Sequence, residues 1–544
     1  MTLIDSQDRA QITSVCCIGA GYVGGPTCAV ISAKCPEISV TVVDNDTQKI
    51  AAWNSDELPV YEPGLKELVK RQRHKNLTFS TDIRSAIHSA QMIIIAVGTP
   101  PIPAAADGTG ESRGLPTDLR AIEQCVQMIA QESLESKIVV GKSTVPCGTS
   151  SKIQQILGKY ARPGVRFNLL SNPEFLSEGT AIQDLLLPDR VIIGCSPLDV
   201  DSQWAQNQLK QIYLHWVPEH KILTMDRWSS ELTKLASNAM LAQRISSINS
   251  VSAICEATGA DITKVAAGCG MDTRLGPRFL RASLGFGGSC FHKDVVSLVW
   301  LCRELGLPEV AEYWYQVLVI NDLQTKRFGY RVIDTLAGDR GSSIQGRRVA
   351  CLGFAYKEGT GDTRNTPAAD VCRLLVKHGA HISIYDPKVP RYHILEKLNM
   401  DDTDCSNSDT VLICDDPYSA IAGSEAVVVL TAWSEFRHLD WKRVPASLAM
   451  SQLQPYVDRK VSVIMNDGRL VVGMLRGLDQ TTNIIMQGCQ ERIFSEDEGV
   501  EVVELGLYMI RGDNIAVIGL VDEEVDDKLD LESLRGIPLP SLKH

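Results

Sequence analysis

The first 225 residues alternate short runs of apolar and β-branched residues with longer segments in which apolar residues recur at helical spacing. Continuous apolar runs are typical of parallel strands that are buried on both faces. A small-residue helical pattern at 26–34 separates the first two runs. The runs lie at residues 14–18, 38–44, 92–97, 137–140 and 167–170. The pattern therefore predicts an α/β domain with a parallel sheet.

The pattern changes twice further along the chain. From residue 228 to about 257 no Gly or Pro intervenes and the apolar residues keep a helical spacing, which predicts one long helix of the kind that connects domains. A second α/β unit follows, with strands expected at 347–353, 381–386 and 425–431 and a helix near 368–378. After residue 443 the chain turns to short alternating strands, and Met450 reads like a fresh N-terminus.

These patterns define the expected architecture. We predict an α/β fold of two Rossmann-like, doubly wound domains joined by a long central helix, followed by a small all-β barrel. The expected domains are a first Rossmann-like domain at 1–227, a central helical dimerisation domain at 228–327, a second Rossmann-like domain at 328–449 and a small β domain with an acidic tail at 450–544.

Composition narrows the class of protein. The 16 cysteines are scattered and include the adjacent pair Cys16 and Cys17 in an expected core strand, so we expect reduced thiols. No apolar run approaches the roughly twenty residues that cross a bilayer, and the polar N-terminus lacks a signal-peptide core. The net charge of −12 argues against broad nucleic-acid affinity but leaves room for a local RNA site. We expect a cytoplasmic protein.

The N-terminal strand leads into a dinucleotide fingerprint. Gly19, Gly21 and Gly24 follow it in the spacing GxGxxG, and Asp44 ends the next strand. In this arrangement the first glycine makes the turn, the second admits a pyrophosphate, and the third lets the helix pack on the strand. Asp44 would bind the ribose hydroxyls, and its charge would repel a 2′-phosphate. The sequence therefore favours NAD over NADP.

A second glycine-rich stretch, GFGGSCFHKD at 285–294, presents one cysteine beside a lysine. A thiolate is the nucleophile, and a neighbouring cation or helix N-terminus lowers the pKa of a thiol. With the dinucleotide site, Cys290 is predicted to be reactive, although most free cysteines are simply buried.

Three further polar groups are candidates for chemistry. Glu174 and Glu178 lie four residues apart after a strand, and on a helical turn they would share one face. A solvated helix start is the simpler explanation of that pair. Lys234 and Asn238 are also four apart, on the long helix, where surface exposure is an equal alternative. The polar loop at 356–364 is suited to phosphates or sugar hydroxyls.

Residues 14 to about 443 closely resemble the UDP-glucose 6-dehydrogenase family of the eukaryotic type. The resemblance rests on GAGYVGGPT, the loop at 61–64, STVP, NPEFLSEGTA, SSELTKLASNA, GFGGSCFHKD and TGDTR, in family order. It implies a four-electron oxidation of UDP-glucose to UDP-glucuronate with two NAD+ and water, through a covalent thioester. A nucleophilic cysteine beside a nicotinamide site agrees with that chemistry. GDP-mannose and UDP-N-acetylmannosamine remain alternative substrates.

The resemblance also implies roles for individual residues. Cys290 would be the nucleophile, Lys234 the first-step acid/base or oxyanion partner, and Glu174 the base that activates water. A desolvated lysine could serve because burial lowers its pKa. The supporting catalytic residues would be Asn238 beside the lysine, and Asp294 and Thr144 in positioning roles. No metal site is expected.

Binding residues follow from the same resemblance. The cofactor would be held by Gly19, Gly21, Tyr22, Val23, Gly24, Asp44, Lys49, Thr99, Ser143, Glu178, Lys293 and Arg364. UDP-glucose would be held by Phe175, Leu176, Glu178, Arg274, Arg281, Phe286, Gly287 and Lys357. The resemblance also implies NAD binding by residues 1–227 and UDP-sugar binding by residues 328–449, a domain that is expected to be truncated in this chain. A homo-oligomer, a dimer or higher, through the central helix is expected, without a membrane partner.

The chain departs from this family at three points. Gly98 stands where family members usually carry Asn, and the Pro-, Ala- and Gly-rich loop at 101–118 is longer. The family continues beyond Trp441 with a strand ending in Asp-Gly-Arg, whose arginine reaches the substrate of a neighbouring subunit. Here a tripeptide of that composition occurs at 467–469, too far along, and we interpret it as coincidence.

Residues 450 to about 520 resemble Sm-like proteins, Lsm8 in particular, through the half-motifs at 467–475 and 505–519. Such domains form seven-membered rings that hold uridine tracts, so other LSm subunits and U6-type RNA are the implied partners, and a nuclear location is implied for this part. Asn483, Arg511 and Asp513 match base-contacting positions. Thr481 stands where many Sm proteins have an aromatic residue or His that stacks on a base. The alternative function is a structural β-barrel that does not bind RNA.

The acidic stretch at 521–527 is expected to be a solvated tail or a short helix.

The sequence therefore predicts two functions of different class on one chain. A cytosolic dehydrogenase and a splicing-related RNA-binding subunit share no obvious logic, which suggests two adjacent genes joined by a gene-model error or a real fusion. The dehydrogenase is the primary prediction. The alternative is an RNA-binding ring subunit whose dehydrogenase portion is inactive or impaired.

Overall fold

The computed structural model describes residues 11–100, 102, 117–338, 343–400, 410–440, 453, 456–478 and 483–539. Most of the predicted loop at 101–118 and the predicted start at Met450 lie outside these residues. Within the described part of the chain no helix has both the length and the apolarity needed to cross a membrane. All cysteines in that part are free thiols, as the sequence predicted.

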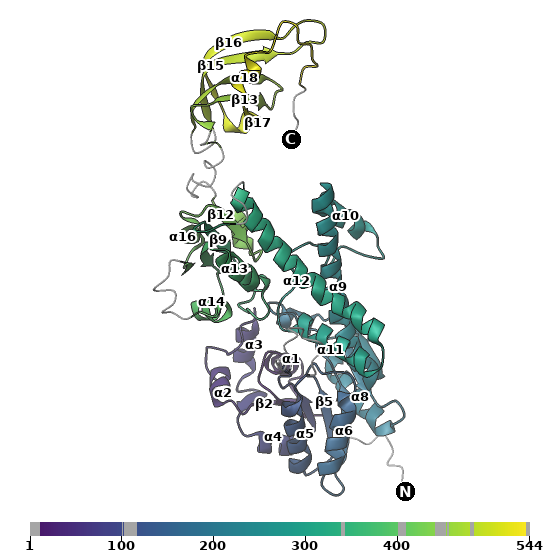
Figure 1. Cartoon of the computed structure of the whole chain (residues 1–544). Helices are drawn as coiled ribbons and strands as arrows, with labels where there is room; N and C mark the ends of the chain where they lie inside the picture. Colours follow the sequence, from purple (N-terminus) through teal and green to yellow (C-terminus); the bar gives the residue numbers. More distant parts are fainter. Residues whose placement is uncertain are drawn as a thin grey trace.

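An eight-stranded sheet organises the N-terminal unit, drawn in purple and blue in Figure 1. The strands are β1 (Ser14–Ile18), β2 (Ser39–Val43), β3 (Leu77–Ser80), β4 (Met92–Ile95), β5 (Lys137–Gly141), β6 (Phe167–Ser171), β7 (Val191–Cys195) and β8 (Ile222–Asp226). Their order is β3-β2-β1-β4-β5-β6-β7-β8, parallel except where β7 meets β6. The order reverses direction between β1 and β4, the point at which such sheets bind ligands.

Helices cover both faces of this sheet. They are α1 (Gly24–Lys34), α2 (Thr47–Trp53), α3 (Leu65–Gln72), α4 (Ile83–Ser89), α5 (Arg120–Glu132), α6 (Thr149–Tyr160), α7 (Ala181–Leu186) and α8 (Val200–Leu214), with the 3-10 helix η1 (Glu219–Lys221). The α1, α3, α7 and α8 helices enclose one apolar core, and α4, α5 and α6 enclose a second core on the opposite face. Two cores explain why the central strands are apolar on both sides.

Long helices form the middle of the molecule (Figure 1). The elements are α9 (Arg227–Thr258), α10 (Ile262–Met271), α11 (Cys290–Glu304) and α12 (Pro308–Ala337). Asp226 caps α9 by accepting a hydrogen bond from the Ser229 backbone N–H at 2.9 Å. The α9, α11 and α12 helices share an apolar core of their own. The predicted long helix is confirmed, within a residue at each end.

A smaller parallel sheet follows. It comprises β9 (Arg348–Leu352), β10 (His381–Tyr385), β11 (Val411–Ile413) and β12 (Ala426–Val429), in the order β11-β10-β9-β12. Around it lie α13 (Pro367–Lys377), α14 (Arg391–Leu398), α16 (Pro417–Ile421) and the 3-10 helix η3 (Ser434–His438). This second α/β unit has its own core, built from the sheet and α13.

The C-terminal unit, yellow in Figure 1, is a five-stranded antiparallel sheet. Its strands are β13 (Lys460–Met465), β14 (Leu470–Leu478), β15 (Ile484–Ile493), β16 (Glu501–Ile510) and β17 (Ile515–Leu520), with η6 (Gly512–Asn514) and α18 (Glu523–Asp526). Alternate residues of β13 are buried, as expected for a curved sheet around a small core. The tripeptide at 467–469 forms the turn between β13 and β14, and α18 is the short helix predicted for the acidic stretch.

Candidate functional site

The predicted catalytic residues come together where three strands end. The loops after β4, β5 and β6 meet α9 and the first turn of α11. Carboxyl ends of parallel strands lie at one edge of a sheet, which brings these loops together. We call the predicted catalytic residues the catalytic group: Thr144, Glu174, Lys234, Asn238, Cys290 and Asp294. The elements that carry it are far apart in the sequence, as the hydrogen bond from Lys293 Nζ to Thr99 Oγ1 (3.2 Å) illustrates.

Cys290 is the first residue of α11, and its side chain reaches solvent. Burial by the surrounding protein and the charge of Glu174 raise its pKa, and the charge of Lys234 opposes them. The adjacent Lys293 instead bonds to Thr99. The prediction that a neighbouring lysine lowers the pKa of this thiol is therefore wrong, because burial and the charge of Glu174 together outweigh the charge of Lys234.

Lys234 forms a buried ion pair with Glu174. Lys234 Nζ lies 3.2 Å from Glu174 Oε1, with side-chain exposures of 4% and 7%. Burial alone would lower the pKa of Lys234, but the charges of Glu174 and Asp294 outweigh it and raise the pKa. The expected lowering is therefore wrong, as is the alternative of surface exposure. Burial alone would raise the pKa of Glu174. The charge of Lys234 and the hydrogen bond from the Leu176 N–H outweigh burial, so the pKa of Glu174 is lowered. Both partners stay charged.

Glu174 and Glu178 do not share a helical face. Residues 172–177 are irregular, and α7 begins only at Ala181. Pro173 lies two residues beyond the strand and has no N–H to support a helix. Glu174 points into the catalytic group, where Thr144 Oγ1 donates to its Oε1 at 3.2 Å. The helix-start explanation of this pair is therefore wrong.

Asp294 has one free oxygen in a buried position. Asn238 Nδ2 donates to Asp294 Oδ2 at 2.6 Å, while Asp294 Oδ1 is buried and has no protein partner. Burial raises the pKa of this carboxyl group, against the charge of Lys234. A buried acceptor without a partner calls for a water molecule or a ligand. A separate cavity of about 20 Å³, lined in part by Thr144 and Lys234, is large enough for one water molecule.

The glycine-rich approach to Cys290 is held against the second sheet. A Cβ on Gly287 would lie 2.4 Å from the carbonyl oxygen of Asn365, so no other residue fits there. Asn365 Nδ2 donates to the Gly288 carbonyl oxygen at 3.1 Å. Phe286 is buried, and its N–H donates to Asn321 Oδ1 at 2.7 Å. The thiol is thus presented by a segment fixed from two sides.

The dinucleotide fingerprint has the predicted division of roles. A Cβ on Gly24 would stand 2.0 Å from the Gly19 carbonyl oxygen, so this glycine allows close packing of α1 on the strand. In contrast, no atom lies within 4 Å of the corresponding position on Gly21. No side chain caps α1 at Val23, which leaves its first N–H groups available for a phosphate. The loop therefore fits a dinucleotide.

Asp44 lies at the end of β2 beside this loop. Its Oδ2 accepts from the Ala20 N–H at 2.9 Å and from Lys49 Nζ at 3.2 Å. Burial opposes ionisation, but the N–H groups of Asp46 and Ala20 and the Lys49 side chain lower the pKa of Asp44. A fixed, ionised carboxylate suits ribose hydroxyls. On the other side of the site, Ser143 Oγ donates to the Val97 carbonyl oxygen at 2.8 Å.

The predicted polar loop at 356–364 locks onto the loop that carries Glu178. Arg364 Nη2 lies 2.8 Å from Glu178 Oε1 and 2.6 Å from Asp362 Oδ2. Lys357 Nζ donates to Ser177 Oγ at 2.8 Å. Burial and the charge of Asp362 raise the pKa of Glu178 to about 7. The two α/β units therefore meet at the site through charged groups that were predicted separately as cofactor and substrate contacts.

Glu62 is a site residue that sequence reasoning missed. This carboxylate is buried, and its oxygens accept from the Tyr22 hydroxyl, from the Gly179 N–H at 2.7 Å and from the Ala181 N–H at 3.0 Å. It therefore joins the phosphate-binding loop to the loop that carries Glu178. In the sequence Glu62 stood out only as part of the loop at 61–64. No local pattern indicates that its backbone partners, Gly179 and Ala181, lie 117 and 119 residues away.

Some predicted substrate residues stand apart. Phe175 is not among them: its ring centroid lies 4.0 Å from the Arg190 guanidinium and 5.3 Å from Lys234 Nζ. Leu176 packs against the core. Arg274 pairs with Asp272 at 2.7 Å and is 87% exposed, and Arg281 is also exposed. Within this chain neither arginine is brought to the catalytic group by a described contact.

The predicted RNA residues lie around one turn of the C-terminal sheet. Asn483 Oδ1 accepts from the Gly512 N–H at 2.9 Å and so fixes the turn that follows β16. Arg511 is exposed next to it. Thr481 and the Asp513 side chain lie outside what the structure describes.

Successive parts of the chain match models of two known families. In sequence order, residues 13–217 match the NAD binding domain, 228–323 the central domain and 350–460 the UDP binding domain of the UDP-glucose/GDP-mannose dehydrogenase family. Residues 451–520 match the LSM domain.

Individual relatives cover most of the chain. UDP-glucose 6-dehydrogenase of Drosophila melanogaster is 50% identical over 437 residues, which is 80% of this chain and 90% of the fly protein. The mouse protein of the same name is 48% identical over 488 residues, 89% of this chain and 95% of its own length. The structure of a UDP-glucose dehydrogenase from Pyrobaculum islandicum aligns with a TM-score of 0.68 at 30% identity, over 81% of this chain and 94% of that one.

Proposed function

Because the chain belongs to the UDP-glucose/GDP-mannose dehydrogenase family, we propose that it oxidises UDP-glucose to UDP-glucuronate in two successive NAD-dependent steps. The relatives that carry this activity in their names share about half of its residues. The alcohol at C6 first becomes an aldehyde and then a carboxylic acid, with water as the source of the second oxygen.

The residues at the fingerprint fit the cofactor NAD, whose binding domain the chain carries. The open backbone at Gly21 and the uncapped start of α1 are suited to the pyrophosphate, and Asp44 to the ribose. NAD+ accepts one hydride in each oxidation. Thr99 and Ser143 lie in the loops after β4 and β5, and Lys293 on α11 donates to Thr99, so these three residues would lie on the nicotinamide side of the cofactor.

Cys290 is proposed to capture the aldehyde. The thiol loses its proton to water as its sulfur adds to C6, and loss of a hydride to NAD+ from the resulting alkoxide adduct leaves a thioester on the protein. The Lys234 ammonium group stabilises the oxygen on which negative charge develops. Of the two roles considered for this lysine, its raised pKa supports the oxyanion partner over a general base, because a charged amine has no free electron pair. The proton of the alcohol passes to water.

Glu174 is proposed to complete the reaction. Its lowered pKa keeps it ionised, so it can take a proton from the water that attacks the thioester. Thr144 orients this carboxylate through the 3.2 Å hydrogen bond, and Asp294, held by Asn238, offers its free oxygen to water or substrate. Hydrolysis frees the Cys290 thiol and releases the acid.

One observation carries this proposal: a cysteine at a helix start faces a buried lysine and buried carboxylates beside a dinucleotide loop. The sharpest test is to trap the thioester. With NAD+ and UDP-glucose, the Glu174→Gln variant should accumulate a covalent adduct by intact-protein mass spectrometry, and the Glu174→Gln, Cys290→Ala double variant should not. An adduct that persists without Cys290, or no adduct from folded protein, would refute the mechanism.

A second function is proposed for residues 450–544, where the family match supports only an LSM domain. We propose that this unit pairs edge to edge with other LSm units, of the Lsm8 type, and binds U-rich RNA. The observation in favour is that β16 and β17 end the sheet and present apolar side chains, with Leu507 74%, Met509 66% and Val517 54% exposed.

Fluorescence anisotropy with labelled oligouridine and oligoadenosine tests the RNA proposal on the full chain. Arg511→Ala should weaken binding of oligouridine, whereas Arg535→Ala, which alters an exposed arginine elsewhere in the unit, should not. Equal binding of both oligonucleotides, or no effect of Arg511→Ala, would leave the LSM unit as a structural or protein-binding module.

A further inference from the structure

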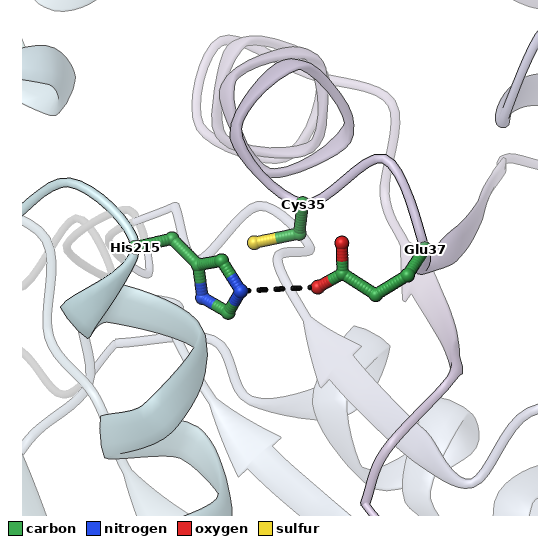
Figure 2. A group of neighbouring side chains, drawn as sticks. All are labelled: Cys35, Glu37 and His215. Carbon is green, nitrogen blue, oxygen red and sulfur yellow. Dashed lines mark ion pairs between the residues drawn. The ribbon is translucent and has the colours of Figure 1, made fainter.

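A thiol, a carboxylate and an imidazole converge on the side of the N-terminal sheet that carries α1 and α8 (Figure 2). They belong to Cys35, the residue that ends α1, to Glu37, two residues later, and to His215, the residue that ends α8. The sulfur, a carboxylate oxygen and a ring nitrogen all lie within 4.8 Å of one another. No residue of the proposed dehydrogenase mechanism belongs to this group.

The imidazole of His215 is oriented toward the group by backbone contacts. Nδ1 lies 3.0 Å from the carbonyl oxygen of Gln211 and 3.1 Å from that of Ile212, so it must carry a proton. Nε2 lies 3.1 Å from Glu37 Oε1. A carbonyl that holds the far nitrogen is the usual support of a metal-binding histidine, because it presents the lone pair of the near nitrogen to the ion.

Both ring nitrogens therefore face oxygen acceptors. A neutral imidazole with its proton on Nδ1 would point a lone pair at the carboxylate, which is repulsive. Either a second proton or a cation must lie between Nε2 and Glu37. A divalent cation would also satisfy the sulfur of Cys35, which makes only a weak contact of 3.7 Å to the Ile212 carbonyl oxygen.

The ligand set indicates the kind of ion. Zinc binds thiolate sulfur at about 2.3 Å and imidazole nitrogen or carboxylate oxygen at about 2.0 to 2.2 Å, in tetrahedral geometry. Donor atoms within 4.8 Å of one another need only small side-chain movements to reach those distances. Thiolate and carboxylate charges would neutralise a divalent ion, and exposures of 31% for His215 and 45% for Glu37 leave room for entry and for a water ligand.

We propose that Cys35, Glu37 and His215 bind one zinc-like divalent transition-metal ion, with water as the fourth ligand. On binding, the thiol of Cys35 loses its proton to water and its sulfur coordinates the ion. The ion then joins the end of α1 to the end of α8. Since α1 begins at the fingerprint glycines, the ion would stabilise the cofactor-binding unit from the end of the helix opposite to the pyrophosphate.

The simpler arrangement is an ion pair between a protonated His215 and Glu37 above a buried thiol. Burial and the charge of Glu37 raise the pKa of Cys35 to about 12, so the sulfur keeps its proton unless a cation displaces it. The two arrangements differ in one observable property, a bond between metal and sulfur. Cobalt(II) reports that bond, because thiolate coordination gives it an intense near-ultraviolet charge-transfer absorption.

The test titrates cobalt(II) into the full chain carrying Cys290→Ala, which removes the thiol of the catalytic group. We expect one cobalt per chain with a thiolate charge-transfer absorption, displaced by zinc. Cys35→Ser should abolish the absorption, and His215→Gln should weaken binding by at least about tenfold. Cys269→Ser, which removes an exposed cysteine on α10, should change neither result.

Stability supplies an independent readout. Stoichiometric zinc should raise the melting temperature of the Cys290→Ala chain and should not raise that of its His215→Gln variant. His215 is partly exposed, so its variant decides the question if Cys35→Ser folds poorly. No charge-transfer absorption, or an absorption that survives both Cys35→Ser and His215→Gln, would show that the group is only an ion pair and would overturn the proposal.

Discussion

Glu62→Gln tests whether the two loops of the dehydrogenase site act as one unit. The wild-type carboxylate accepts three hydrogen bonds, from Tyr22 and Gly179 at Oε1 and from Ala181 at Oε2. Glutamine has nearly the same shape but replaces one of these oxygens with an NH2 group. The substitution therefore changes hydrogen bonding and charge while it leaves packing almost unaltered.

The magnitude follows from counting acceptors. If the amide oxygen replaces Oε1, the Ala181 N–H faces an NH2 group. If it replaces Oε2, the Tyr22 hydroxyl and the Gly179 N–H lose their acceptor. In either orientation at least one buried N–H is left without a partner, which costs about 1 to 3 kcal/mol. If this cost falls on the NAD-bound state, the affinity for NAD decreases by about 5-fold to about 150-fold.

Steady-state rates of NADH formation, with NAD+ and UDP-glucose varied separately, provide the assay. We expect kcat/KM for NAD+ to fall by that factor in Glu62→Gln. Tyr22→Phe removes one donor and leaves both N–H bonds, so it should have a smaller effect. Glu67→Gln, on the exposed face of α3, is the matched control and should match wild type. A folded Glu62→Gln enzyme within about twofold of wild type for both substrates would refute the reasoning.

Three further predictions concern charged groups. The pKa of Glu178 is raised from 4.5 to about 7, so the free energy of unfolding should fall as the pH rises from about 4.5 to about 7. Glu178→Gln should flatten this part of a plot of melting temperature against pH, and an unchanged plot would contradict the assignment. Lys234→Met should lower kcat by about 10² to 10³-fold with a smaller change in UDP-glucose binding by calorimetry, and an undiminished kcat would exclude the oxyanion role. Asp526→Asn breaks a nearly buried ion pair in which Asp526 Oδ1 lies 2.6 Å from Arg492 Nη1, and it should lower the free energy of unfolding of the C-terminal sheet by about 3 kcal/mol. Only the unfolding transition of that unit should then move to lower temperature. A shift of every transition would show that the units unfold together.

The sequence was most informative where local pattern determines structure. Apolar runs predicted β1, β2, β4, β5 and β6 of the first sheet but not β3, β7 or β8, and the absence of Gly and Pro predicted α9. Both signals act within a few residues. The roles of Gly21 and Gly24 followed from spacing alone, since a missing Cβ has the same steric meaning in any such turn. The order of the strands explains why separate motifs reach a single site.

The sequence was least informative where an effect depends on distant partners. The pKa of Lys234 shifts in the direction opposite to the expected one, because the charges of Glu174 and Asp294, from other elements, together outweigh burial. Glu62 gave no signal, since its acceptors serve N–H groups more than 100 residues away. The Cys35 group was not expected either, because the residues that end α1 and α8 meet only in the folded chain. Each case required the tertiary structure.

The stoichiometry of NADH to UDP-glucose tests the central claim most directly. The purified full chain is given limiting UDP-glucose and excess NAD+, and NADH is measured by absorbance against the substrate consumed. The proposed mechanism predicts two NADH for each UDP-glucose, with UDP-glucuronate as the product. One NADH with release of an aldehyde would contradict the thioester step, and no NADH from folded protein would show that the chain needs the Asp-Gly-Arg segment expected of its family.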